Sequence, residues 1–334
     1  MKRPSTEQLV DGVRAGDRAL LGRAITLVES NARRHQAQAQ ELLQALLPHT
    51  GGAMRVGITG VPGVGKSTFI ESLGMFLAEQ GRRPAVLAVD PSSGVSGGSI
   101  LGDKTRMQRL SVHDAAFVRP SPSGGNLGGV ARKTRESMLL CEAAGYDVIL
   151  VETVGVGQSE IVVAEMVDTV LLLLLPGAGD ELQGIKRGIL ELIDVVAVNK
   201  AEGANEIAAR QAKVEYQSGL KLIRPATEWM PPVLTASGLT GLGLEAVWQA
   251  VTDHGEALTA SGELDRKRRR QQLSWMWSLV QERLLASFKA SPSVIERLAS
   301  LQDDVGAGRR TPATAAMELL DGFAKDQQSP ADPP

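Results

Sequence analysis

Seven short apolar runs constrain the fold of this chain most strongly. They alternate with segments of helical length, and they cover residues 55–59, 85–89, 115–118, 147–151, 169–175, 194–198 and 232–235. Runs of this kind are typical of parallel strands that are buried on both faces and joined by crossover helices. The sequence therefore predicts an α/β fold with an open, mostly parallel sheet of about seven strands. Ligands of such sheets bind at the carboxyl ends of the strands.

Helical patterns flank the predicted sheet domain on both sides. Residues 6–47 have a helical pattern that ends before Pro48, with apolar residues on roughly one face, and we expect N-terminal helices there; residues 263–288 have the pattern of a long helix. The last residues are polar and rich in proline, which is typical of disorder. We therefore expect four parts: an N-terminal helical segment (1–50), the α/β domain (51–260), a C-terminal helical extension (261–325) and a disordered tail (326–334).

Composition argues against several classes of protein. The formal net charge of −2 is not that of a nucleic-acid or anionic-membrane binder. No apolar run is long enough to span a bilayer and no signal peptide is visible, so we expect a cytoplasmic protein. Cys141 is the single cysteine, so no intrachain disulfide can form, and we expect its side chain to be buried. The basic cluster Arg266–Arg270 is typical of a solvated helix face.

A glycine-rich segment lies between the first predicted strand and the following helix. Its sequence, Gly-Val-Pro-Gly-Val-Gly-Lys-Ser, has the spacing of a phosphate-binding loop, in which backbone N–H groups surround a phosphate. In such a loop Lys66 bridges the β- and γ-phosphates, and the hydroxyl of Ser67 binds Mg²⁺. We expect the nucleotide to contact this loop and the residue after it: Gly60, Val61, Pro62, Gly63, Val64, Gly65, Lys66, Ser67 and Thr68.

Two further segments indicate which base is bound. Asn199-Lys200-Ala-Glu202 follows the sixth predicted strand, and its carboxylate can accept hydrogen bonds from N1–H and the exocyclic amine of guanine together. Adenine lacks the N1 proton and would leave that carboxylate unpaired, so the pattern favours GTP over ATP. The usual acid at this position is aspartate, and the longer Glu202 side chain changes its reach. Ser237-Gly238, after the last strand, resembles the loop whose backbone N–H groups contact guanine O6.

Carboxylates at or beyond the ends of predicted strands are candidates for holding Mg²⁺ and orienting the attacking water. Asp90 ends the second strand, Asp103 follows it at a distance, and Glu152 ends the fourth strand. Glu152-Thr-Val-Gly155 occupies the position of an Asp-x-x-Gly switch, in which Gly155 can donate its N–H to the γ-phosphate. Two glycine-rich segments are further candidate switches: residues 91–100 and 176–186.

Together these residues resemble the methylmalonyl-CoA mutase-associated GTPases, the MeaB/ArgK-like metallochaperone family of SIMIBI-class P-loop GTPases. The resemblance runs from about residue 8 to about residue 290. Its most specific segments are 56–68, 88–93, 97–107, 151–159 and 176–186. It implies a homodimeric GTPase, with residues 261–325 as the dimerisation arm. Such a protein couples hydrolysis of GTP to GDP to cofactor loading and protection of an adenosylcobalamin-dependent acyl-CoA mutase of the methylmalonyl-CoA mutase type, without binding cobalamin directly.

The resemblance also implies roles for individual residues. It places Ser67, Asp90, Asp103 and Glu152 around Mg²⁺ and Arg106 near the phosphates, and it adds Lys186 to Lys66, Asp103 and Glu152 as catalytic residues. Two alternatives stay open. Relatives have been labelled as kinases that phosphorylate a periplasmic-binding-protein-type amino-acid transport component. The chain can also be a module that uses GTP only as a structural ligand.

Overall fold

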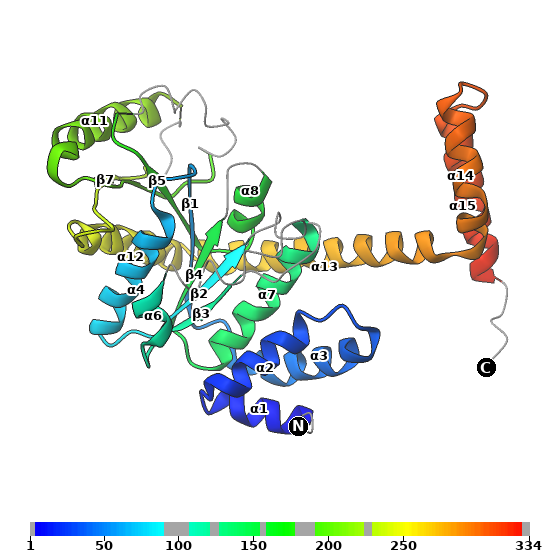
Figure 1. Ribbon diagram of the computed structural model, residues 1–334, viewed down its shortest axis with the longest axis horizontal. Coiled ribbons are helices and arrows are strands. Elements are labelled where there is room, and N and C mark those ends of the chain that lie inside the picture. Colours follow the sequence, from blue (N-terminus) through cyan, green and yellow to red (C-terminus); the bar gives the residue numbers. More distant parts are fainter. Residues whose placement is uncertain are drawn as a thin grey trace. The chain divides into compact units, whose positions relative to one another are not determined.

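The computed structural model of the chain describes residues 4–89, 107–120, 127–153, 158–177, 191–223 and 229–328 (Figure 1). The chain forms two compact units, Met1–Arg269 and Arg270–Pro334, and the first unit contains the sheet. Within the described ranges, no helix is both long enough and apolar enough to cross a membrane.

The sheet of the first unit has seven strands, and every pairing is parallel. The strand order is β3-β2-β4-β1-β5-β6-β7, so β1 lies between β4 and β5. The strands are β1 (Met54–Gly60), β2 (Pro84–Val89), β3 (Phe117–Arg119), β4 (Val148–Thr153), β5 (Thr169–Leu174), β6 (Val195–Val198) and β7 (Val233–Thr235). The predicted α/β fold with a parallel sheet of about seven strands is confirmed.

Helices cover both faces of the sheet, which explains why the strands are continuously apolar. Figure 1 shows α4 and α12 on one side of the sheet and α7 and α8 on the other. In β1, Val56 and Ile58 pack in the core of the first side, whereas Gly57 faces α8, where a Cβ would lie 2.7 Å from Val163. The helices are α4 (Lys66–Glu79), α6 (Gln108–Val112), α7 (Leu127–Ala143), α8 (Gln158–Ala164), α11 (Glu206–Ile223) and α12 (Leu244–Ala260), with a 3-10 turn η2 (Gly203–Asn205).

Cys141 lies on α7 and is completely buried, as predicted. Desolvation by burial and, to a smaller extent, the neighbouring carboxylate of Glu142 raise the pKa of its thiol far above the usual value. Because the thiolate is the reactive form of cysteine, this side chain is an inert part of the core.

The N-terminal segment is helical, as predicted, and it forms three helices. The chain turns at Gly16, where φ is +73°, and the carboxylate of Asp17 then accepts hydrogen bonds from the N–H groups of Ala19 and Leu20. The elements are α1 (Thr6–Arg14), α2 (Arg18–Val28), α3 (Arg33–Leu46) and the 3-10 turn η1 (Leu47–His49).

Three helices follow α12: α13 (Glu263–Ala290), which begins in the first unit and ends in the second, α14 (Pro292–Gly306) and α15 (Pro312–Gln328). In the second unit, Asp326 on α15 accepts hydrogen bonds from the hydroxyls of Ser291 and Ser293 and from the Ser293 N–H. α15 continues to Gln328, past the boundary at residue 326 that the sequence predicted. Residues 329–334 lie outside the described ranges.

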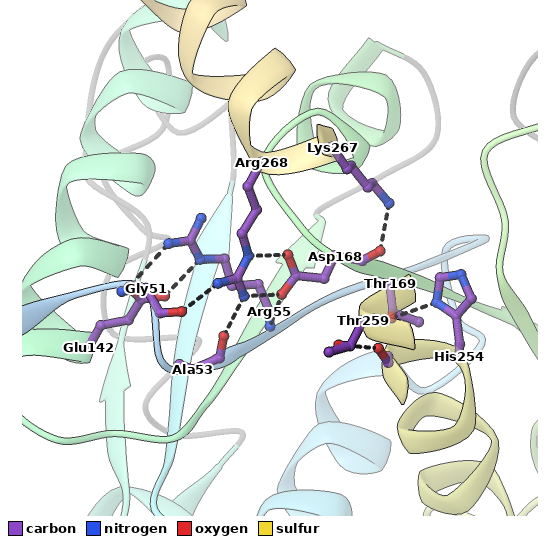
Figure 2. A network of polar contacts seen from close by, with 11 residues as sticks. Gly51, Ala53, Arg55, Glu142, Asp168, Thr169, His254, Thr259, Lys267 and Arg268 are labelled. Atoms are coloured by element: carbon purple, nitrogen blue, oxygen red, sulfur yellow. Dashed lines mark hydrogen bonds and ion pairs between the residues drawn. The ribbon is translucent and has the colours of Figure 1, made fainter. Parts of the chain in front are cut away.

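Part of the basic cluster at the start of α13 is docked against the sheet domain (Figure 2). Arg268 donates to both carboxylate oxygens of Asp168, at 2.8 and 2.6 Å, and to the carbonyl oxygens of Gly51 and Ala53. The ammonium of Lys267 donates to the carbonyl oxygen of Asp168 at 2.6 Å. The expectation of a solvated face is therefore wrong for Arg268 and Lys267, because a buried carboxylate before β5 binds the first of them.

Candidate functional site

The glycine-rich loop lies at the carboxyl end of the central strand, because β1 ends at Gly60 and α4 begins at Lys66. A side chain at Gly60 is excluded, since a Cβ would lie 2.4 Å from the carbonyl oxygen of Leu173 on β5. Gly63 and Gly65 have φ values of +79° and +91°, which favour glycine. A tight loop therefore leads directly into a helix N-terminus, an arrangement that binds anions.

Lys66 folds back over this loop. Its ammonium donates to the carbonyl oxygens of Gly60 at 2.6 Å and Val61 at 3.2 Å. Burial lowers the pKa of this lysine, and the carboxylates of Glu152 and Glu160 act in the opposite direction. The Lys66 ammonium therefore lies beside the N-terminus of α4, and a phosphate bound there would contact the ammonium and the N–H groups of the helix.

Ser67 and Glu152 lie next to each other. The Ser67 hydroxyl donates to Glu152 Oε1 at 2.9 Å, and Glu152 is 4% exposed at the end of β4. A hydroxyl and a carboxylate are the hard oxygen ligands that Mg²⁺ prefers, so this pair fits the expected metal. The other two predicted ligands, Asp90 and Asp103, lie outside the described residues. Among the residues that are described, no group of three or more His, Cys, Asp or Glu side chains could hold a metal.

Asn199 joins the glycine-rich loop to the segments predicted to bind the base. It follows β6 and is buried, its Nδ2 donates to Val64 O at 2.8 Å, and its Oδ1 accepts from the Gly238 N–H at 2.9 Å. Lys200, with φ of +58°, donates to Gly63 O at 2.7 Å. Segments more than a hundred residues apart in the sequence therefore meet at one edge of the sheet.

Glu202 follows in the same segment, and part of its carboxylate is buried. Its Oε2 is buried and has no hydrogen-bond partner among the described residues. A buried carboxylate oxygen without a partner is costly unless a ligand supplies a donor. This atom is therefore suited to accept hydrogen bonds from a bound molecule.

Two backbone N–H groups after β7 are hydrogen-bonded within the protein. Ser237 and Gly238 lie at the site, but the Ser237 N–H donates to Leu242 O at 2.8 Å and the Gly238 N–H donates to Asn199. Both donors are occupied within the protein. The sequence could not show this, because it depends on how the loop closes on itself.

In addition to Asp90 and Asp103, three further residues of the predicted site lie outside the described ranges: Arg106, Gly155 and Lys186. Two residues near the site were not predicted. Glu160 on α8 is 3% exposed and acts on Lys66, and Ser72 on α4 donates to Gly238 O at 2.6 Å. Neither belongs to a short motif, and only the packing of α8 and α4 brings them to the site.

A parallel sheet with a phosphate-binding loop after its central strand defines a P-loop nucleoside triphosphatase. Within this class, the sequence model of one family, "Methylmalonyl Co-A mutase-associated GTPase MeaB", matches residues 21–293. The chain belongs to this family and is a GTP-hydrolysing enzyme.

Individual relatives agree with this assignment. A "Putative GTPase" of Caulobacter vibrioides is 57% identical over 310 residues, which are 92% of this chain and 95% of that protein. The "Methylmalonic aciduria type A homolog, mitochondrial" of Mus musculus is 49% identical over 328 residues, 95% of this chain and 79% of that protein. The crystal structure of a "LAO/AO transport system kinase" superposes with a TM-score of 0.77 at 38% identity, covering 97% of this chain and 99% of the other.

Proposed function

We propose that GTP binds across the edge of the sheet formed by the glycine-rich loop (Gly60–Thr68) and the segment from Asn199 to Glu202. The observation that carries this proposal is the Asn199 side chain, which bonds both Val64 O in the loop and the Gly238 N–H. Phosphate and base sites are thereby held at a fixed separation. Glu202 Oε2, which has no hydrogen-bond partner among the described residues, would supply the acceptor for the guanine edge.

Hydrolysis of GTP mainly requires the protein to neutralise charge on the phosphates and to orient the attacking water. Mg²⁺, held by Ser67 and Glu152 together with Asp90 and Asp103, would neutralise charge on the phosphates. Lys66 would bind phosphate oxygens with its ammonium, which already faces the loop carbonyls. Arg106, Gly155 and Lys186 complete the proposal as phosphate-contacting or switch residues.

We further propose that hydrolysis drives the protection and cofactor loading of an adenosylcobalamin-dependent acyl-CoA mutase. The family description and the name of the mouse relative support this role. The proposed working form is a homodimer in which residues 261–325 form the dimerisation arm. Exposed apolar side chains on α13 support this arm, and they are Leu273, Met276, Trp277, Val280, Leu284 and Leu285.

The test uses the full chain and a purified methylmalonyl-CoA mutase. We expect the wild-type protein with GTP to slow inactivation of the mutase during turnover, and Lys66→Ala to give no protection because it cannot bind the phosphates. Mutase half-life and GTP turnover are measured in the same samples. A mutase half-life that is unaffected by the wild-type protein, while GTP is hydrolysed, would reject the chaperone role and leave the GTPase intact.

A second candidate is suggested by the name of the solved relative, a transport system kinase. A kinase would transfer the γ-phosphoryl group to a protein acceptor instead of water. With γ-labelled GTP and a purified amino-acid-binding transport protein, we expect the label in inorganic phosphate. Label on the transport protein that depends on Lys66 would favour the kinase.

A further inference from the structure

Strands β1 and β4 end side by side at the nucleotide site, where two threonine side chains join them. The backbone pairing between the two strands ends at Ile58 and Glu152. One residue further along each strand, the Thr153 hydroxyl donates to Thr59 Oγ1 at 3.0 Å. The same hydroxyl lies 3.5 Å from Ile58 O. The threonine pair therefore continues the connection between β1 and β4 beyond the end of their backbone pairing.

Beyond this point each strand is paired with its other neighbour. Thr59 is paired with Leu172 of β5, and Thr153 is paired with Val89 of β2. The strand order places β3, β2 and β4 on one side of this junction and β1, β5, β6 and β7 on the other. The hydroxyl pair therefore bridges the two parts of the sheet at their nucleotide-binding end.

Each threonine is adjacent in sequence to a residue of the candidate site. Thr59 precedes Gly60, the first residue of the glycine-rich loop. Thr153 follows Glu152, whose Oε1 accepts a hydrogen bond from Ser67 at 2.9 Å. Because Ser67 lies at the other end of the loop, the threonine pair connects the start of the loop to the carboxylate that contacts its end.

The two hydroxyls lie in apolar surroundings that do not require them. Thr59 is 2% exposed and Thr153 is completely buried. Alternation along β4 places Thr153 on the same face as Val151, which belongs to the apolar core that contains Val163 of α8. Replacing two bonded polar groups by apolar groups of the same shape is nearly neutral for stability, or stabilising. Valine has the shape of threonine, so two valines would satisfy the fold at these positions.

We propose that Thr153 and Thr59 are positioning residues, which hold Glu152 at the distance from Ser67 at which both can bind Mg²⁺. The inference rests on the proposed Mg²⁺ site. Without the hydroxyl pair, the end of β4 can move away from β1, and the Glu152 carboxylate moves with it. Binding of the metal must then restore the position of the carboxylate, and the metal affinity falls.

The experiment measures metal affinity directly in the full-length protein. Mn²⁺ replaces Mg²⁺, and its dissociation constant from the complex with a non-hydrolysable GTP analogue is measured by electron paramagnetic resonance. The variants are Thr153→Val, Thr59→Val, the double variant with both changes, and Thr153→Ser. Thr134→Val is the matched control, because it also removes a buried threonine hydroxyl, which is bonded at 2.9 Å to Val130 O within α7.

We expect Thr153→Val and Thr59→Val each to raise the Mn²⁺ dissociation constant about three- to tenfold, the size of one hydrogen bond. The double variant should raise it by the same factor and not by the product of the two, because both changes remove the same bond. Thr153→Ser keeps the hydroxyl and should lie close to the wild type. Thr134→Val should match the wild type.

Thermal unfolding without metal and nucleotide separates positioning from folding. We expect the double variant to melt at the temperature of the wild type or above it, because two methyl groups replace two hydroxyls in an apolar core. If the Mn²⁺ affinity falls only in variants whose melting temperature also falls, the threonine pair supports the fold alone and the inference is overturned.

An unchanged Mn²⁺ dissociation constant in the double variant would also overturn the inference. Failure of the proposed Mg²⁺ site has a different result, because Ser67→Ala and Glu152→Gln would then leave the Mn²⁺ affinity unchanged as well. That result would reject the metal site and the inference with it. A loss of affinity in Ser67→Ala and Glu152→Gln but not in the double variant would reject the inference alone.

Discussion

A buried carboxylate oxygen without a partner destabilises a protein unless its ligand supplies a donor, and Glu202 has such an oxygen among the described residues. We expect Glu202→Gln to weaken GDP binding about ten- to hundredfold, because hydrogen bonds to a charged acceptor are lost, while ADP binding stays unchanged. Glu206→Gln, on the exposed first residue of α11, should leave both unchanged. Calorimetric titration measures the affinity of each variant for both nucleotides. If Glu202→Gln loses the same factor of affinity for GDP and for ADP, Glu202 does not recognise the base.

Individual residues show what the sequence can and cannot predict about a site. The glycine-rich loop and the Asn199 segment are short contiguous motifs, and the rule that carboxyl ends of parallel strands share one edge brings them together. The availability of a backbone N–H at Ser237 or Gly238 is set by how the loop closes, which no local pattern specifies. Ser72 belongs to no motif and reaches the site through the packing of a whole helix.

At the scale of the element, the start of α13 depends on Arg268. Its partner Asp168 is 2% exposed, so removing the guanidinium would leave a buried charge unpaired. We expect Arg268→Ala to lower the free energy of unfolding by about 3–5 kcal/mol. The neighbouring Arg266 is a matched control, because its side chain is 60% exposed and Arg266→Ala should cost no more than about 1 kcal/mol. Urea unfolding measures the free energy of unfolding of both variants. If the two variants lose similar amounts, the docking of Arg268 contributes little to stability.

The hairpin of α14 and α15 carries an acid-sensitive contact. Hydrogen bonds from Ser291 and Ser293 hold the pKa of Asp326 below its usual value of 3.8. Because the native pKa is the lower one, the stabilisation is complete above the unfolded pKa and is lost as the pH falls through the native pKa. We expect Asp326→Asn to lower the melting temperature at neutral pH. Between about pH 5 and about pH 2, the melting temperature of this variant should decrease less than that of the wild type.

Melting followed by circular dichroism across this pH range tests the role of Asp326. Asp321→Asn is the control, since Asp321 is exposed on the same helix. If the melting temperature of Asp326→Asn falls as steeply with decreasing pH as that of the wild type, Asp326 is not the source of the acid sensitivity. At this scale the sequence predicted a helical extension to residue 325 but not its continuation to Gln328, because the side chains that bond Asp326 belong to the start of another helix.

At the scale of the whole molecule, the exposed apolar side chains of α13 lead us to expect a partner chain. Leu273, Trp277, Val280 and Leu284 are spaced four, three and four residues apart, which places them on one helix face, and Trp277 is 60% exposed. This spacing is typical of a seam between helices, and a second copy of the chain would cover it. We expect the wild type to sediment as a dimer and Trp277→Asp to raise the dimer dissociation constant about thirtyfold or more.

Leu222→Asp separates this seam from general apolar exposure. Leu222 on α11 is 88% exposed, more than Trp277, but it belongs to a different helix, in the first unit. If exposure alone drove association, the Leu222 variant would dissociate at least as readily as the Trp277 variant. If the α13 face is the seam, only Trp277→Asp shifts the sedimentation equilibrium towards monomer. A dimer that survives Trp277→Asp would place the interface on another part of the chain.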